Sequence, residues 1–84
     1  MADTAGRLIV SSHHSDEVFR YNETNGVFLN VMISAGSGGL NAPHGLAFGP
    51  DRNLYVGSAL SDEVLRYNGE TGAYRFYRAN VLLL

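Results

Sequence analysis

The chain has 84 residues, with six Lys or Arg against eight Asp or Glu, a formal net charge of -2 and no cysteine. This composition excludes a disulfide framework, a zinc–thiolate site and thiol redox chemistry, and the lack of a basic stripe argues against nucleic acid as a partner. A chain of this size buries a small share of its surface, so we expect a marginal core when it is alone.

Neither end of the sequence carries a targeting or membrane signal. Residues 1–6 have no positively charged region and no apolar region of the kind found in a signal peptide. The longest fully apolar run is Val81–Leu84, which is far too short to span a membrane. We therefore expect no membrane partner and a cytoplasmic chain as expressed, and the native compartment is left open.

The sequence repeats itself at a distance of 46 residues. Shifted by that amount, Leu8–Phe28 aligns with Leu54–Tyr74 without a gap, and 11 of the 21 aligned pairs are identical. The longest identical run is Ser-Asp-Glu-Val, at Ser15–Val18 and again at Ser61–Val64. Self-similarity over this length indicates a duplicated supersecondary unit.

The repeated units have the residue pattern of β-strands. Apolar and polar residues alternate with a period of two, and clusters of Asn, Asp, Gly and Pro separate the alternating runs. No segment has the pattern of a helix. The sequence predicts an all-β chain with seven strands, at residues 7–11, 16–22, 27–33, 45–48, 53–57, 62–67 and 73–79.

One segment supports a comparison with a known family. Pro43–Val56, which reads Pro-His-Gly-Leu-Ala-Phe-Gly-Pro-Asp-Arg-Asn-Leu-Tyr-Val, resembles the blade motif of the NHL and virginiamycin B lyase-like β-propellers. With the first copy, the resemblance covers about residues 8–77. It implies four-stranded antiparallel blades around a channel, with the strand after the Pro-His-Gly turn innermost. Residues 1–40 are then a first blade without its inner strand, plus a connector, and residues 41–84 a second blade with a tail.

The same resemblance suggests one candidate for catalysis or metal binding. The family includes lyases, lactonase-like hydrolases and binding scaffolds, so the fold does not choose the function. Its lyases use a divalent metal with histidine and glutamate, and His44 matches the motif histidine. The further Glu and His would follow the second strand, where this chain has Gly57–Ser61. His44 is thus a weak metal candidate, and we assign no catalytic residue and no cofactor.

Two other segments have a structural interpretation that outweighs the functional one. His13 and His14 are adjacent at the end of a strand, where neighbouring side chains point to opposite faces, so we expect exposed histidines and not a metal-binding pair. The loop Ser34–Leu40 is rich in glycine but lacks the Lys-Ser/Thr of a phosphate-binding loop and a following helix. It is predicted to be a flexible connector between blades.

Acidic pairs and aromatic residues recur at the same positions of both copies. Asp16–Glu17 and Asp62–Glu63 are predicted to bond turns or to pair with Arg20 and Arg66 between blades. The aromatic residues are predicted to pack in the core and between blades and not to stack on a ligand: Phe19, Tyr21, Phe28, Tyr67, Tyr74, Phe76 and Tyr77.

These observations favour a structural function. We expect a two-blade, non-enzymatic unit that assembles with copies of itself into a closed propeller, three chains being the first choice and four the second, because six blades are usual for the resembled family. The alternatives are a metal-dependent lyase or hydrolase, or a binding module that uses loops at one mouth of the ring for a peptide or sugar, a ligand that the sequence does not name.

The apolar end of the sequence suggests how the copies could join. Where the first copy continues into the flexible connector, the second ends in four apolar residues: Val81, Leu82, Leu83 and Leu84. Such residues are compatible with a β-strand. We expect all four at the oligomer interface, as the inner strand of a neighbour's first blade.

Overall fold

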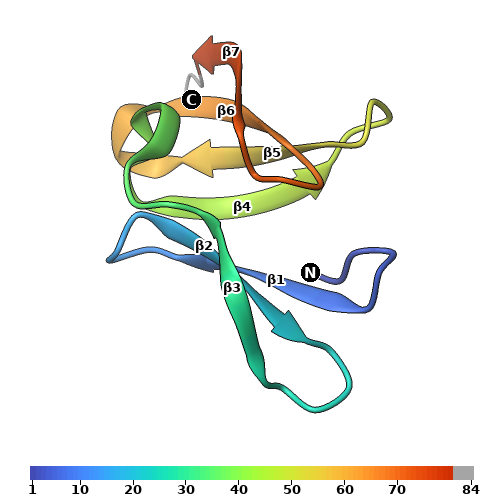
Figure 1. Ribbon diagram of the computed structural model, residues 1–84. Helices are drawn as coiled ribbons and strands as arrows, with labels where there is room; N and C mark the ends of the chain where they lie inside the picture. Colours follow the sequence, from blue (N-terminus) through green and yellow to red (C-terminus); the bar gives the residue numbers. More distant parts are fainter. Residues whose placement is uncertain (81–84) are drawn as a thin grey trace.

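The computed structural model describes residues 1–80, which form two antiparallel sheets stacked face to face (Figure 1). The all-β prediction is confirmed, and every predicted strand is present within two residues of its expected ends. The first sheet has three strands and the second has four: β1 (Arg7–Ser12), β2 (Glu17–Asn22) and β3 (Phe28–Ile33), then β4 (Pro43–Phe48), β5 (Asn53–Ser58), β6 (Glu63–Asn68) and β7 (Tyr74–Asn80).

Helical structure in residues 1–80 is limited to two single turns. These are the 3₁₀ turns η1 (Ser37–Gly39) and η2 (Ala59–Ser61). No helix in this part of the chain has the length and apolar character needed to cross a membrane.

The sequence repeat is also a structural repeat. Strand order follows chain order in both sheets, and the pairing of β1 with β2 has the same register as the pairing of β5 with β6. Leu8 lies opposite Tyr21, just as Leu54 lies opposite Tyr67. Each residue of β1 and β2 can therefore be compared with the residue 46 positions later in β5 and β6, whereas β3 and β7 pair in partly different registers.

The hairpin turns of the two sheets are built by the same bonds. Asn22 Oδ1 accepts the N–H of Thr24 at 2.8 Å, and Asn68 Oδ1 accepts the N–H of Glu70 at 2.8 Å. Both turns close on a glycine with positive φ, a conformation that a residue without a Cβ adopts most readily. The two turns therefore present their backbone carbonyls in equivalent positions.

The two sheets pack through opposite faces. The first sheet buries Ile9, Val18 and Ile33, whereas the second buries the face that carries Leu54, Val56, Leu65 and Tyr67; together these residues belong to one core cluster. Ile9 aligns with Tyr55, not with Leu54 or Val56. The face that the first sheet buries therefore corresponds, by the repeat, to the face that the second sheet leaves open. The packing is thus head to tail.

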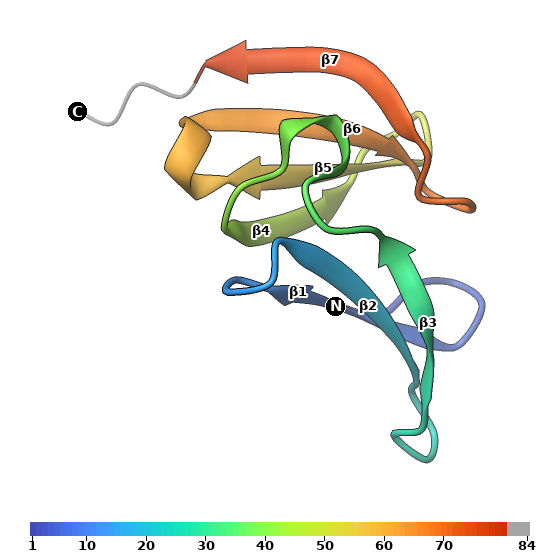
Figure 2. The ribbon, with the colours of Figure 1, turned by 60° about the vertical axis from the view of Figure 1, so that its left-hand side comes forward.

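The connector from β3 to β4 packs against the second sheet. Residues 34–42 cross toward β4 in Figure 2, and the hydroxyl of Tyr67 donates a hydrogen bond to the carbonyl of Ser37 at 2.5 Å. Gly38 lies against Tyr74, and a Cβ at this position would overlap the aromatic ring. The buried phenol needs a hydrogen-bond partner, which the connector provides.

The β1 edge of the first sheet carries a short stub of a fourth strand. The N–H of Ile9 donates to the carbonyl of Met1 at 2.6 Å, and Ala2 forms a β-bridge with Leu8. In the second sheet, the equivalent bridge is the pair Phe48 and Leu54. The sequence predicts that the inner strand is wholly absent from the first sheet, whereas Met1 and Ala2 hold its last two positions.

Candidate functional site

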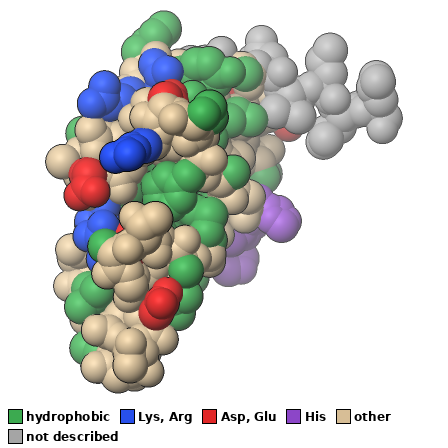
Figure 3. All heavy atoms as spheres, turned by 90° about the vertical axis from the view of Figure 1, so that its right-hand side faces the viewer, with side chains coloured by type: hydrophobic (Ala, Val, Ile, Leu, Met, Phe, Trp, Pro, Cys, Tyr) green, Lys and Arg blue, Asp and Glu red, His purple; other side chains and the backbone are tan. Residues whose placement is uncertain are grey.

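The three histidines lie close together where the end of β1 approaches the start of β4. The His13 ring lies 5.1 Å from the His14 ring and 6.4 Å from the His44 ring, centroid to centroid, and all three side chains are exposed. Figure 3 shows the histidine side chains (purple) at one side of the molecule. This arrangement was not predicted, because His13 and His14 fall in a turn, where strand alternation does not apply, and because the approach of β1 to β4 is long-range.

The side chains around His44 do not fit the metal site that the family resemblance implies. Residues 1–80 contain no group of three His, Cys, Asp or Glu side chains arranged to hold a metal ion. The backbone of His44 serves the fold, because its carbonyl lies 3.4 Å from the hydroxyl of Ser11 on β1. This contact helps to join the two sheets.

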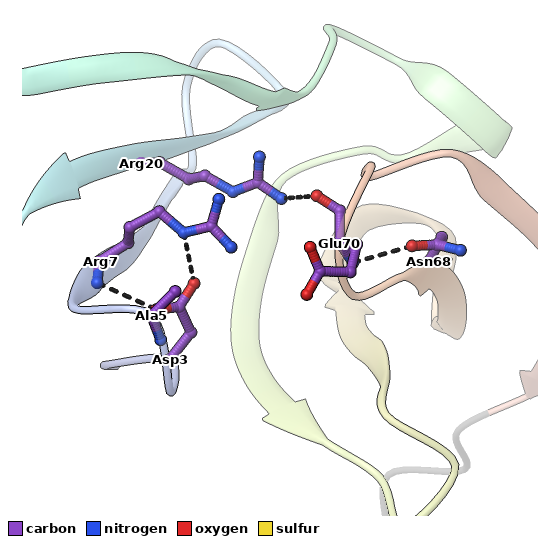
Figure 4. A network of polar contacts seen from close by, with 6 residues as sticks. All are labelled: Asp3, Ala5, Arg7, Arg20, Asn68 and Glu70. Carbon is purple, nitrogen blue, oxygen red and sulfur yellow. Dashed lines mark hydrogen bonds and ion pairs between the residues drawn. The ribbon is translucent and has the colours of Figure 1, made fainter.

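A buried arginine forms the main polar contact across the two sheets. The guanidinium of Arg20, in a residue only 5% exposed, donates a hydrogen bond to the backbone carbonyl of Glu70 in the hairpin turn of the second sheet (Figure 4). Burial lowers the pKa of Arg20 from its ordinary value. Pairing between blades was predicted for this residue, but with a neighbouring carboxylate and not with a carbonyl.

The recurring acidic pair has the structural task expected of it, through one residue. The carboxylate of Asp16 accepts the N–H of Ala42 at 2.7 Å, and its backbone carbonyl accepts the N–H of Gly36 at 3.2 Å. Asp16 therefore fixes both ends of the connector to the turn between β1 and β2. Its repeat partner Asp62 has the same left-handed backbone, with φ of 53° against 58°.

A pair of serines secures the segment that leads into β4. The hydroxyl of Ser58 accepts the N–H of Asn41 at 2.9 Å and lies 3.2 Å from its carbonyl, and Ser61 donates to Ser58 at 2.6 Å. The repeat equivalents, Ser15 and Ser12, form the same hydroxyl pair at 2.6 Å. These serines were not predicted from the sequence, although their recurrence at a fixed distance was a visible signal.

An aromatic cluster lies on the open face of the first sheet. Phe28 is 50% exposed, and its ring lies 5.9 Å from Phe19 and 5.5 Å from Tyr21 in edge-to-face geometry. Val10 on the same face is 40% exposed, whereas its equivalent Val56 is fully buried. The open face of the first sheet therefore leaves apolar side chains exposed.

The open face of the second sheet carries a different group. Tyr77 packs edge-to-face on Tyr55 at 5.5 Å, and the guanidinium of Arg66 lies 5.3 Å above the Tyr77 ring. Arg66 also lies 3.7 Å from the carboxylate of Asp51. Hydrogen bonds from Tyr55 and then Asn53, with the charge of Arg66, lower the pKa of Asp51.

A partly buried carboxylate anchors the start of β1. Burial raises the pKa of Asp3, but hydrogen bonds from Arg7 and Ala5 and the charge of Arg7 more than offset this, so the pKa lies below its ordinary value. Arg7 Nε lies 2.7 Å from Asp3 Oδ2. Asp3 also borders a cavity of about 420 Å³ between the sheets. The ionised form of Asp3 is therefore the form that stabilises the fold.

We expect Asp3→Asn to weaken the acid sensitivity of folding. Because the folded pKa is depressed, the carboxylate contributes stability above its unfolded pKa of about 3.9, and this is lost as the pH falls through the folded value. Urea unfolding at pH 7 and pH 3 should show a smaller loss of stability in the variant, by about 1 kcal/mol. An unchanged pH dependence would contradict this assignment.

Comparisons with protein-family models, with curated proteins and with solved structures found no match for this chain.

Proposed function

We propose that this chain is a structural repeat unit of two β-propeller blades, which assembles head to tail with copies of itself into a closed ring and has no catalytic role. The observation that carries the proposal is the packing inside one chain. Within one chain, one face of the first sheet packs on the opposite face of the second sheet. Because of the repeat, the open face of each sheet resembles the face that the other sheet buries, so a second copy could pack in the same way.

The open face of the first sheet matches the buried face of the second. Leu54, Val56, Leu65 and Tyr67 are fully buried against the first sheet and the connector. Their equivalents 46 residues earlier are Leu8, Val10, Phe19 and Tyr21, which are likewise apolar or aromatic. A second copy of the chain could therefore cover them as the first sheet covers their counterparts.

The open face of the second sheet supplies the complementary surface. Ile9, Val18 and Arg20 are buried at the contact between the sheets, and their equivalents are Tyr55, Val64 and Arg66. Because the two open faces differ from each other, the contact between copies is heterologous. Such contacts produce a ring when the rotation closes and a filament when it does not.

The polar contact at the interface can repeat as well. Arg20 binds the carbonyl of Glu70, and the equivalent pair is Arg66 of one copy with Thr24 of a second copy. The hairpin turns that hold Glu70 and Thr24 share their hydrogen bonds, so the carbonyl of Thr24 is placed to accept from Arg66. The guanidinium has donors to spare for this bond.

The apolar tail lies outside the described residues, so its place at the oligomer interface stays a prediction. This holds for each of its members: Val81, Leu82, Leu83 and Leu84. By the repeat, residues 81–84 align in sequence with residues 35–38 of the connector.

The mass of the assembled protein tests the proposal. Three copies would give six blades, and four copies would give eight. Sedimentation velocity over a range of concentrations should show one discrete closed species that persists on dilution, because each copy in a ring is held by two interfaces. A monomer at every concentration, or an open-ended series of lengths, would contradict ring closure.

A further inference from the structure

The inner edge of β1 is open where the same edge of β5 is paired. In the second sheet, Leu46 lies opposite Val56 and Pro43 lies opposite Ser58. In the first sheet, Met1 and Ala2 occupy only the last two equivalent positions, and no strand within residues 1–80 lies on this edge opposite Val10, Ser11 or Ser12. An open strand edge exposes backbone donors and acceptors that can pair with another strand.

Beside this edge is an open groove of about 340 Å³. It is lined by Met1, Ile9, Val10, Ser11, His44 and Leu46. It thus lies between the edge of β1 and the neighbouring strand β4, in the place that an inner strand of the first sheet would fill. Val10, which lines the groove, is 40% exposed, whereas Val56 in the equivalent position of the second sheet is fully buried.

The serine pair that receives the inner strand is already formed in the first sheet. Ser15 donates to Ser12 at the same 2.6 Å as Ser61 does to Ser58. In the second sheet, this pair binds the backbone N–H of Asn41, and the N–H groups of Ala59 and Leu60 bind the carbonyls of Ala42 and Asn41. In the first sheet, the N–H groups equivalent to those of Ala59 and Leu60 belong to His13 and His14.

The geometry points to a peptide-binding site at this edge. An extended, uncharged peptide segment adds to the first sheet as its inner strand. It is bound by the strand β1, the Ser12–Ser15 pair and the turn that follows. Recognition is through backbone hydrogen bonds, with an apolar side chain placed next to Val10 as Leu46 is placed opposite Val56. The site follows from the repeat alone and does not depend on ring assembly.

The repeat also specifies the best ligand. Residues 41–46 fill the equivalent site of the second sheet, and Met1 and Ala2 already occupy the places of residues 47 and 48. The matching peptide is therefore Asn-Ala-Pro-His-Gly-Leu, acetylated so that its first residue offers an amide N–H. A peptide of reversed order retains the composition but places its side chains and its proline differently, and it serves as the control ligand.

Fluorescence anisotropy of the labelled peptide, titrated with the full chain, tests this site. We expect saturable binding that the reversed peptide does not show. Ser12→Ala should raise the dissociation constant about threefold to tenfold, the equivalent of one neutral hydrogen bond. Ser34→Ala, an exposed serine after β3 on the other edge of the same sheet, should leave the dissociation constant unchanged.

Hydrogen exchange gives an independent readout of where the peptide binds. Amides of Val10–Ser12 and of the following turn should exchange more slowly in the presence of the peptide. Absence of binding, or binding that neither protects these amides nor responds to Ser12→Ala, would overturn the proposal. Because the peptide titration needs no assembly, it can fail while ring formation succeeds, and the reverse.

Discussion

Replacing Gly72 by alanine is expected to lower the free energy of unfolding by more than about 3 kcal/mol. Gly72 is buried, has a φ of +77°, and lies so close to Met32 that a Cβ would overlap the backbone carbonyl. The carbonyl of Met32 belongs to the backbone of β3 and is less free to turn aside than the end of a flexible side chain. The substitution therefore strains the backbone of residue 72, and it also forces the two sheets apart at the hairpin turn of the second sheet.

Gly26→Ala is the matched control for this substitution. Gly26 is the repeat equivalent, with a φ of +74°, but a Cβ added there would meet nothing within 4 Å. It should cost only the left-handed conformation, about 1 kcal/mol. Urea unfolding monitored by tyrosine fluorescence measures both, with each substitution made in a chain that also carries Phe28→Glu, so that the contact between copies does not contribute. Equal losses would show that the hairpin turn of the second sheet does not support the contact with the first.

Phe28→Glu is expected to abolish assembly while the single chain remains folded. Phe28 is half exposed and belongs to the aromatic cluster on the open face of the first sheet. Its equivalent Tyr74 is packed against the core cluster and the connector. A charge placed at this position would be buried without a partner on assembly, which should weaken association at least about a hundredfold.

Phe76→Glu supplies the control for the loss of an exposed aromatic side chain. Phe76 is 81% exposed on β7 of the second sheet and does not belong to the aromatic cluster on the first sheet. Size-exclusion chromatography with light scattering should therefore give the wild-type mass for Phe76→Glu and a monomer for Phe28→Glu. Loss of assembly in both variants, or in neither, would rule out the aromatic cluster as the contact surface.

The strands and turns could be predicted from the sequence because their causes are local. Alternating apolar residues identify a half-buried strand, and Asn22–Gly26 and Asn68–Gly72 carry the side-chain oxygen and the glycine that their turns require. The repeat strengthened each assignment, because two copies had to support the same structure.

The contacts between the sheets could not be predicted in the same way. Asp16 reaches Ala42, and Arg20 reaches the turn at Glu70, across separations that no local pattern encodes. The position of His13 beside His44 depends on how closely β1 approaches β4, and the connector is held by Tyr67 from a distant strand. The repeat indicated the positions of the acidic and arginine residues, but only the packing identified their partners.

The most direct test of head-to-tail assembly is native mass spectrometry of two variants, each with one open face blocked. Phe28→Glu blocks the first sheet, and Val64→Glu blocks the second sheet at the equivalent of the buried Val18. Each variant alone should be a monomer, and an equimolar mixture should give a dimer with one copy of each and nothing larger, because only one competent interface remains. Dimers formed by either variant alone, or a mixture that stays monomeric, would contradict head-to-tail assembly.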